Sequence, residues 1–134
     1  MKSLASYVKG EQHIFIIIKP GFLEKSKDII EKFEREGWKI SKMKTKTLLF
    51  SEAKRLYAVH KKEDFYTPLC HYMSSGPSTA IVFSKDAPAT DKVFKKVAGL
   101  KDEIRKQYGE SDMRNVMHSS DSAEAMEHEM GIYF

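Results

Sequence analysis

The stretch Ile14-Phe15-Ile16-Ile17-Ile18-Lys19-Pro20 gives the clearest signal for the fold. Its apolar residues follow one another without a polar interruption, and all but Phe15 are isoleucines, whose β-branched side chains favour strands. A continuous apolar run of this length is typical of a strand that is buried on both faces. Pro20 and Gly21 end the strand, so Lys19 is expected at the end of a sheet, where ligands often bind.

Outward from this strand, apolar residues recur with helical or strand spacing along the rest of the chain. We predict helices at about 29–36, 51–60, 65–74, 93–98 (ended by Gly99) and 121–131, and further strands at 42–47, 79–83 and, after an irregular stretch, 115–117. This order predicts an α+β fold of the ferredoxin-like, split βαβ kind. A four-stranded antiparallel sheet would carry helices packed on one face.

Size and composition are those of one globular domain. The chain has 134 residues, of which 41% are hydrophobic and 31% charged. We predict a flexible N-terminal arm, 1–11, and a single domain, 12–134. The arm lacks the apolar core of a signal peptide, no apolar run approaches the ~20 residues of a membrane span, and Cys70 is the single cysteine, so we expect a cytoplasmic protein. The net charge of +4 suits nucleotides, nucleic acids or acidic proteins alike.

The segment Arg114–Ser122 contains the strongest functional signal. His118 stands just before Ser120-Asp121-Ser122, three good helix-capping types, and Asp121 with Glu124 has the spacing of a capping box. The start of a helix favours anions because its first N–H groups are unpaired. Glu129, two turns into the predicted helix, could orient the imidazole. A histidine with an orienting carboxylate is the general arrangement of an activated nucleophile.

Each candidate residue also has an ordinary structural interpretation. Lys19 and Arg105 could simply reach solvent, and Phe65, which lies off the apolar stripe of its helix, could be partly buried rather than stack on a base. Asn115 could be a turn residue and Tyr57 a core residue. Residue type and spacing alone leave these alternatives open.

Two further patterns are interpreted as structural. Adjacent helical residues diverge by about 100°, so His60, Cys70 and His71 lack the paired spacing of metal ligands. We therefore predict no metal site in the protein itself. The alternating lysines at 42, 44 and 46 indicate the solvated face of a strand rather than a nucleic-acid contact.

Asn115-x-x-His118-x-Ser120-Asp121-Ser122 resembles the signature of the nucleoside diphosphate kinases, whose histidine carries a phosphoryl group between nucleotides. Other blocks follow in the order of that family: Ile16–Pro20, Tyr57–His60, Phe65, Tyr72–Pro77, Ile104-Arg105 and Glu129. The similarity extends from about Gln12 to the C-terminus, and it implies the fold predicted above.

The resemblance implies a nucleoside diphosphate kinase that works by ping-pong transfer on ATP and other nucleoside di- and triphosphates. The implied catalytic residues are His118, Glu129, Tyr57 and Ser120. The implied nucleotide-binding residues are Lys19, Phe65, Leu69, Lys95, Arg105 and Asn115. Mg²⁺ would arrive on the nucleotide phosphates. The protein would be a homo-oligomer built on a dimer, and neither a membrane nor a nucleic acid is expected as a partner.

Three departures separate this chain from the family pattern. Gly21 stands where the family has an aspartate, and Lys95 stands where it has a phosphate-binding arginine, so the planar guanidinium is lost. Between Gly99 and Arg105 the family's loop is several residues longer. That loop carries a phosphate-contacting threonine and helps to build trimer contacts, and neither has a counterpart here.

Two other classes of function remain open at this point. One is a nucleotide-binding or protein-interaction module of the same fold with weak or no kinase activity, which Lys95 and the short loop favour and His118, Asn115 and Glu129 oppose. The other is a nucleic-acid-binding module that uses the positive net charge. It predicts binding that depends steeply on salt.

Overall fold

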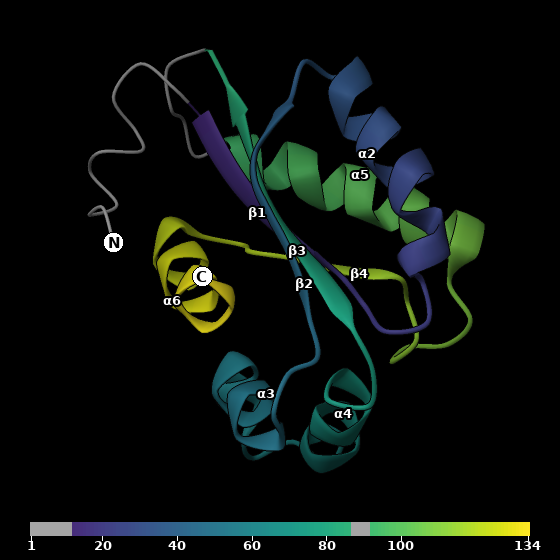
Figure 1. Cartoon of the computed structure of the whole chain (residues 1–134), viewed down its shortest axis with the longest axis vertical. Helices are drawn as coiled ribbons and strands as arrows, with labels where there is room; N and C mark the ends of the chain where they lie inside the picture. The colour runs from purple at the N-terminus through teal and green to yellow at the C-terminus, as the bar shows by residue number, and fades with distance from the viewer. Residues whose placement is uncertain (1–11, 87–91) are drawn as a thin grey trace.

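The structure, a computed structural model, describes residues 12–86 and 92–134. Four strands form one antiparallel sheet in the order β2-β3-β1-β4 (Figure 1). They are β1 (Gln12–Ile18), β2 (Lys39–Lys46), β3 (Ser78–Lys85) and β4 (Met117–Ser119). The predicted α+β fold with a four-stranded antiparallel sheet is confirmed. The predicted N-terminal arm, 1–11, lies outside the described residues.

Successive side chains of β1 enter two separate cores, because side chains alternate between the faces of a strand. Ile14, Ile16 and Ile18 belong to one buried cluster. Phe15 and Ile17 belong to another, on the opposite face of the sheet. The apolar run therefore indicated burial on both faces correctly.

Helices cover both faces of the sheet, so the prediction of helices on one face is wrong (Figure 1). A strand that buries both faces needs a layer of side chains on each. The Ile14 face is covered by α2 (Ser26–Arg35) and α5 (Lys92–Tyr108). The Phe15 face is covered by α3 (Phe50–Leu56), α4 (Tyr66–Met73) and α6 (Ala123–Tyr133), and the short turns η1 (Leu23–Lys25) and η2 (Ala58–His60) lie in connections.

The helix α5 runs through Gly99 without interruption, so the prediction that Gly99 ends it is also wrong. A glycine inside a helix costs about 0.5–1 kcal/mol relative to alanine. Burying the stripe of Val93, Val97 and Ile104 contributes more than this, at ~1.5 kcal/mol or more for each large side chain. The segment that is short relative to the family is therefore two further turns of helix.

The end of the chain differs in detail from the prediction. β4 begins at Met117, two residues later than predicted, so His118 lies within the strand and faces Ile17 of β1 in the register. The helix α6 is capped by Ser122, whose hydroxyl accepts the N–H of Ala125 at 3.1 Å, rather than by Asp121. The capping residue was misassigned because three capping types stand in a row.

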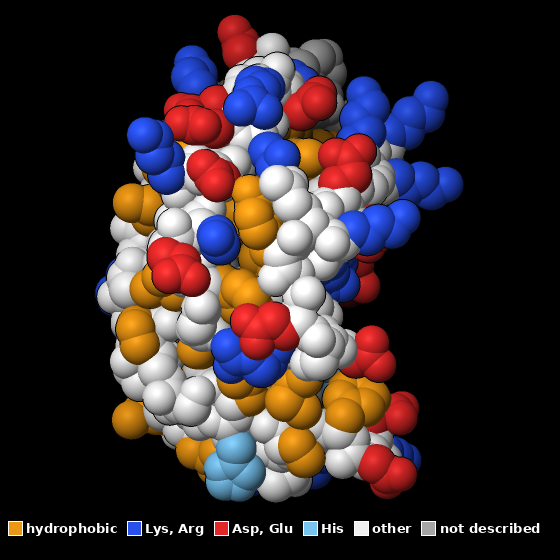
Figure 2. Space-filling view, turned by 90° about the vertical axis from the view of Figure 1, so that its right-hand side faces the viewer, with side chains coloured by type: hydrophobic (Ala, Val, Ile, Leu, Met, Phe, Trp, Pro, Cys, Tyr) orange, Lys and Arg blue, Asp and Glu red, His pale blue; other side chains and the backbone are white. Residues whose placement is uncertain are grey.

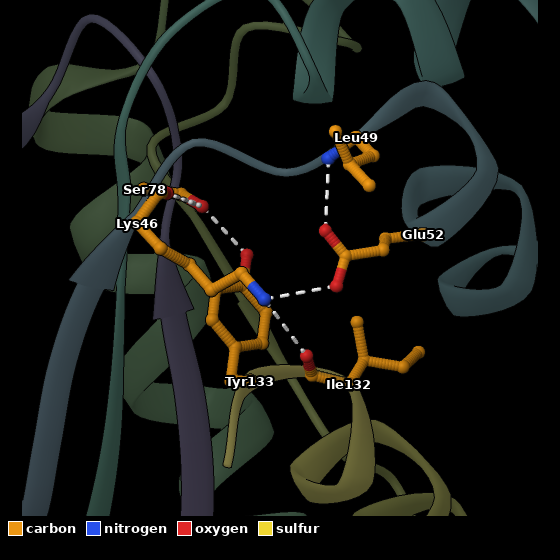
Figure 3. A network of polar contacts seen from close by, with 6 residues as sticks. All are labelled: Lys46, Leu49, Glu52, Ser78, Ile132 and Tyr133. Carbon is orange, nitrogen blue, oxygen red and sulfur yellow. Dashed lines mark hydrogen bonds and ion pairs between the residues drawn. The ribbon is translucent and has the colours of Figure 1, made fainter.

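A polar network fixes the C-terminal end of α6 (Figure 3). Lys46 Nζ lies 2.9 Å from Glu52 Oε2 and donates to the carbonyl of Ile132 at 3.3 Å. The hydroxyls of Tyr133 and Ser78 are 2.6 Å apart. These contacts join α6 to the ends of β2, β3 and α3, and so they hold the helix that carries Glu129. No helix in the described parts of the chain is long and apolar enough to cross a membrane.

Candidate active site

The centre of the site is a chain of hydrogen bonds between β4 and α6. His118 Nε2 lies 2.6 Å from Glu129 Oε1, and the Ser120 hydroxyl donates to the same oxygen at 2.8 Å. The Glu129 side chain is 9% exposed, whereas that of His118 is 22% exposed. The imidazole is thus held from the buried side and open on the other. Because Nε2 faces a carboxylate, Nε2 carries the proton and Nδ1 presents a lone pair.

A strained turn leads into the strand of His118. Val116 has φ +83°, and the N–H of Met117 donates to the carbonyl of Asn115 at 3.1 Å, which closes a three-residue γ-turn. A β-branched residue in this region is unfavourable by about 1–3 kcal/mol. The burial of Val116 and a 2.8 Å hydrogen bond from Lys19 N to its carbonyl offset this cost.

Lys19 is held at the end of β1 beside this turn. Its Nζ donates to Asn115 Oδ1 at 2.7 Å, and the amide group of Asn115 donates to the carbonyl of Asp112 at 2.7 Å. Burial, together with the nearby charges of Arg105 and Lys101, lowers the pKa of Lys19 to about 7. An anion that enters the site would stabilise the protonated form of this amine.

Arg105 approaches from α5. Its Nε and Nη2 donate to the carbonyl of Met117, the residue before His118, at 3.2 and 2.8 Å. Lys101 lies one turn earlier on the same flank of α5 and was not predicted. Its only sequence signal is the i, i+4 spacing to Arg105, and this pairing holds only if the helix continues through Gly99.

Tyr57 lies against the imidazole. The two rings meet edge to face, with centroids 5.8 Å apart and an interplanar angle of 80°. Burial raises the pKa of the Tyr57 hydroxyl well above its usual value. Among the described residues, this hydroxyl has no hydrogen-bond partner. A buried, unpaired hydroxyl beside the proposed nucleophile is a donor available to a bound group.

Phe65 remains 44% exposed, and its ring lies 5.2 Å from that of His60, which in turn lies 6.5 Å from that of Tyr57. His60 was interpreted as structural, but it occupies the space between two site residues. Leu69 is 7% exposed and belongs to the core cluster. Phe65 therefore offers an open ring face, and Leu69 is largely committed to the core.

The structure does not bring Lys95 to this group. Lys95 lines a cavity of about 370 Å³ together with Gln12 and Trp38. Gln12 is five residues from Ile17, the partner of His118 in the sheet, which is about 17 Å along β1. On the face shown in Figure 2, Lys and Arg side chains gather on the upper half of the molecule, the half that contains α2 and α5.

Gly21 has φ +89°, a conformation that other residues rarely adopt. A Cβ at this position would lie 2.8 Å from Arg114 Nη2. The Arg114 guanidinium packs over the rings of Phe22 and Tyr72, at 5.4 and 5.3 Å from their centroids. The glycine at the position of the family's aspartate therefore leaves room for this arginine.

Comparisons with known proteins all point to one family. The family model described as nucleoside diphosphate kinase matches residues 12–134. A nucleoside diphosphate kinase of Kosmotoga olearia is 33% identical over 132 residues, which cover 92% of this chain and 88% of that protein. That of Chlorobium limicola is 35% identical over 127 residues, 88% of this chain and 89% of that protein. A crystal structure of the Aquifex aeolicus nucleoside diphosphate kinase has a TM-score of 0.75 at 30% identity and covers 92% of this chain and 95% of that one.

Proposed function

The chain belongs to the nucleoside diphosphate kinase family, and we propose that His118 carries the γ-phosphoryl group of a nucleoside triphosphate to a nucleoside diphosphate. The observation that carries the proposal is the 2.6 Å contact between His118 Nε2 and Glu129 Oε1. It fixes the ring through one nitrogen and leaves the other free to react.

The transfer has two balanced steps. The lone pair of Nδ1 attacks the γ-phosphorus, an N–P bond forms, and the nucleoside diphosphate leaves with the electrons of the broken P–O bond. A terminal oxygen of a second diphosphate then attacks the phosphorus, and the imidazole recovers its lone pair as the N–P bond breaks. Glu129 stabilises the positive charge that the ring carries as the phosphohistidine forms and breaks down, and Ser120 holds Glu129 in place.

Positioning and charge stabilisation account for the rest of catalysis, because phosphoryl transfer needs little other covalent chemistry. Lys19 and Arg105 would bind the phosphates; Lys19 is held by Asn115, and Arg105 by the carbonyl of Met117, the residue before His118. A bound polyphosphate would raise the depressed pKa of Lys19 and keep this amine charged. The Tyr57 hydroxyl can donate to the phosphoryl group.

For the nucleotide base we propose a single-sided stack on Phe65. Its exposed ring suits a base of any kind, since stacking on an aromatic face is worth about 1–3 kcal/mol and does not depend on base identity. Asn115 would bond the sugar hydroxyls, and the small exposed part of Leu69 would border the base.

Mg²⁺ would be bound by the nucleotide phosphates and water. No three His, Cys, Asp or Glu residues in the described part of the chain are grouped to hold a metal ion. The ion would neutralise phosphate charge when bound, and the residues of this chain would position the phosphates around it.

We further propose a homo-oligomer built on a dimer, in the cytoplasm. The edge strand β2 is exposed along nearly all its length, and Ile40 and Met43 are 42% and 54% exposed. An exposed edge with apolar side chains is suited to pairing with a second copy. Sedimentation that gives a monomer at high protein concentration would contradict the dimer.

Intact-mass measurement after mixing with ATP and Mg²⁺ tests the function directly. We expect one added phosphoryl group that is labile in acid and stable in base, and that is lost when a second nucleoside diphosphate is added. A protein that binds ATP without becoming phosphorylated would contradict the kinase and leave a nucleotide-binding module. Binding to DNA or RNA that depends steeply on salt would favour a nucleic-acid-binding module.

A further inference from the structure

The helix α5 has two flanks on either side of its buried stripe, and only one of them faces the site. At about 100° per residue, Lys101 and Arg105 lie about 40° apart around the helix axis, whereas Lys95 and Lys96 lie about 120° and 140° from Lys101. Lys96 and Lys95 line the cavity near Trp38. Lys101 therefore shares the flank of Arg105, whose guanidinium is bound beside His118.

The charges around Lys101 are those of the active site. Burial lowers the pKa of Lys101, and the charge of Arg105 lowers it further, whereas the carboxylates of Asp102, Asp121 and Glu129 oppose the shift. Glu129 is the partner of His118. Lys101 in turn contributes to the lowered pKa of Lys19. The amine thus lies within electrostatic range of both the imidazole partner and the phosphate-binding lysine.

Lys101 differs from the other two cations of the site in what it already binds. Lys19 is bonded to Asn115, and Arg105 to the carbonyl of Met117. Within residues 12–86 and 92–134, Lys101 Nζ forms no hydrogen bond or ion pair, although its side chain is half-buried. A half-buried ammonium without a partner costs free energy unless an anion approaches it.

We propose that Lys101 is a catalytic residue that donates to a non-bridging oxygen of the phosphoryl group as it passes to and from His118. This deepens the proposed function and rests on it. Because α5 continues across Gly99, Lys101 lies on a helix in the segment where the family has a longer loop. The positive charge near the phosphoryl group would then come from this helix. Lys101 keeps its protons throughout, and the bonds made and broken are those of the two steps above.

The test measures the rate at which ATP phosphorylates His118, by rapid quench and intact mass, in Lys101→Met and Lys101→Arg. We expect a fall of about 10- to 100-fold in Lys101→Met, because removing one preorganised donor to a transition state has an effect of this order. Affinity for ADP, which lacks the transferred group, should change less than threefold. Lys101→Arg should recover most of the rate, because it keeps the charge.

Lys96→Met is the matched control, since it removes the same charge from the other flank of the same helix, and its rate should stay within twofold of the wild type. Circular dichroism checks that each variant is folded. If Lys101→Met phosphorylates His118 at the wild-type rate, or if Lys101→Arg is as slow as Lys101→Met, this inference is wrong while the proposed function stands. If the wild type itself takes up no phosphoryl group, both are wrong.

Discussion

The two flanks of α5 carry the same kind of charge in opposite surroundings. Lys96 on one flank, and Lys95 on the face opposite the buried stripe, are exposed around a cavity. On the other flank, Lys101 and Arg105 are half-buried beside His118. In the proposed mechanism only Lys101 and Arg105 act on a phosphate, and their position relative to the buried stripe of the helix, rather than their charge, sets them apart from Lys95 and Lys96. Lys95 matches the family's arginine in sequence position, but the structure does not bring it to the group around His118.

The largest effect should come from His118, because the flank of Lys101 and Arg105 matters only if that imidazole reacts. His118→Asn should lower phosphoryl exchange between ATP and a second diphosphate by a factor of at least about 1,000, as expected for the loss of a nucleophile. Binding of ADP, measured by calorimetry, should remain within about threefold, since the cations and Phe65 are intact. His71→Asn is the control, because His71 is exposed and its ring packs against that of Phe50, away from His118 in the sequence and in a different element. Exchange by His118→Asn at the wild-type rate would rule out the phosphohistidine.

Glu129→Gln should have the next largest effect, slowing phosphorylation by about 100-fold without abolishing it. The amide keeps a hydrogen bond to the ring but cannot balance the charge that develops on it. Glu127→Gln, on an exposed position of the same helix, should behave as the wild type. The measurement is the single-turnover rate at which ATP phosphorylates His118. Equal rates in the two variants would mean that Glu129 only packs against the ring.

A smaller effect should appear as proton uptake by Lys19. Its pKa is lowered to about 7 in the free protein, so at pH 8 ADP should bind with uptake of a proton, and affinity should fall by up to tenfold per pH unit above 7. Calorimetry in two buffers of different ionisation enthalpy measures the uptake, and Lys19→Met should abolish it.

The same shift makes the free energy of unfolding depend on pH. Burying the protonated Lys19 amine lowers this free energy by its full amount below pH 7, and the loss fades as pH rises towards 10.5. A ΔG of unfolding that, relative to Lys19→Met, does not rise between pH 7 and 10 would contradict the burial of the amine.

The smallest effect should come from Gly99, which lies between the two halves of α5. A Cβ there would meet nothing within 4 Å, so Gly99→Ala should stabilise the protein by about 0.5–1 kcal/mol, or about 3 °C in Tm. Gly21→Ala should instead destabilise it, because φ is +89° and Arg114 lies 2.8 Å from the new Cβ. A lower Tm in Gly99→Ala would indicate that the helix bends there.

The sequence predicted those elements whose structure depends mainly on residues close together in the chain. The isoleucines of β1 and the segment around His118 combine type and spacing within a few residues, so the sheet and the approach of Glu129 could be anticipated. The ranking among Ser120, Asp121 and Ser122 could not, because each can cap a helix and tertiary contacts decide which one does. Ser120 instead bonds Glu129.

The sequence failed to predict where α5 ends for a different reason. Glycine after an apolar stripe is a normal end of a helix, and only the burial of Ile104 against the sheet shows that this helix continues. The position of Lys101 on the same flank as Arg105 depends on that continuation. Resemblance to a family pointed to Arg105, whose guanidinium donates to the carbonyl of Met117, but it could not anticipate a lysine on a segment where the family has a longer loop.

The position of β1 between β3 and β4 has a consequence for how quickly the enzyme can form. Lys19 bonds a residue 96 positions away, so the site assembles only after a long stretch of chain has closed on itself. Contacts of such large sequence separation form slowly, whereas α5 and α6 can form from local contacts well before them. During refolding, the return of phosphoryl transfer should therefore coincide with insertion of the first strand into the sheet, and helix content should recover earlier.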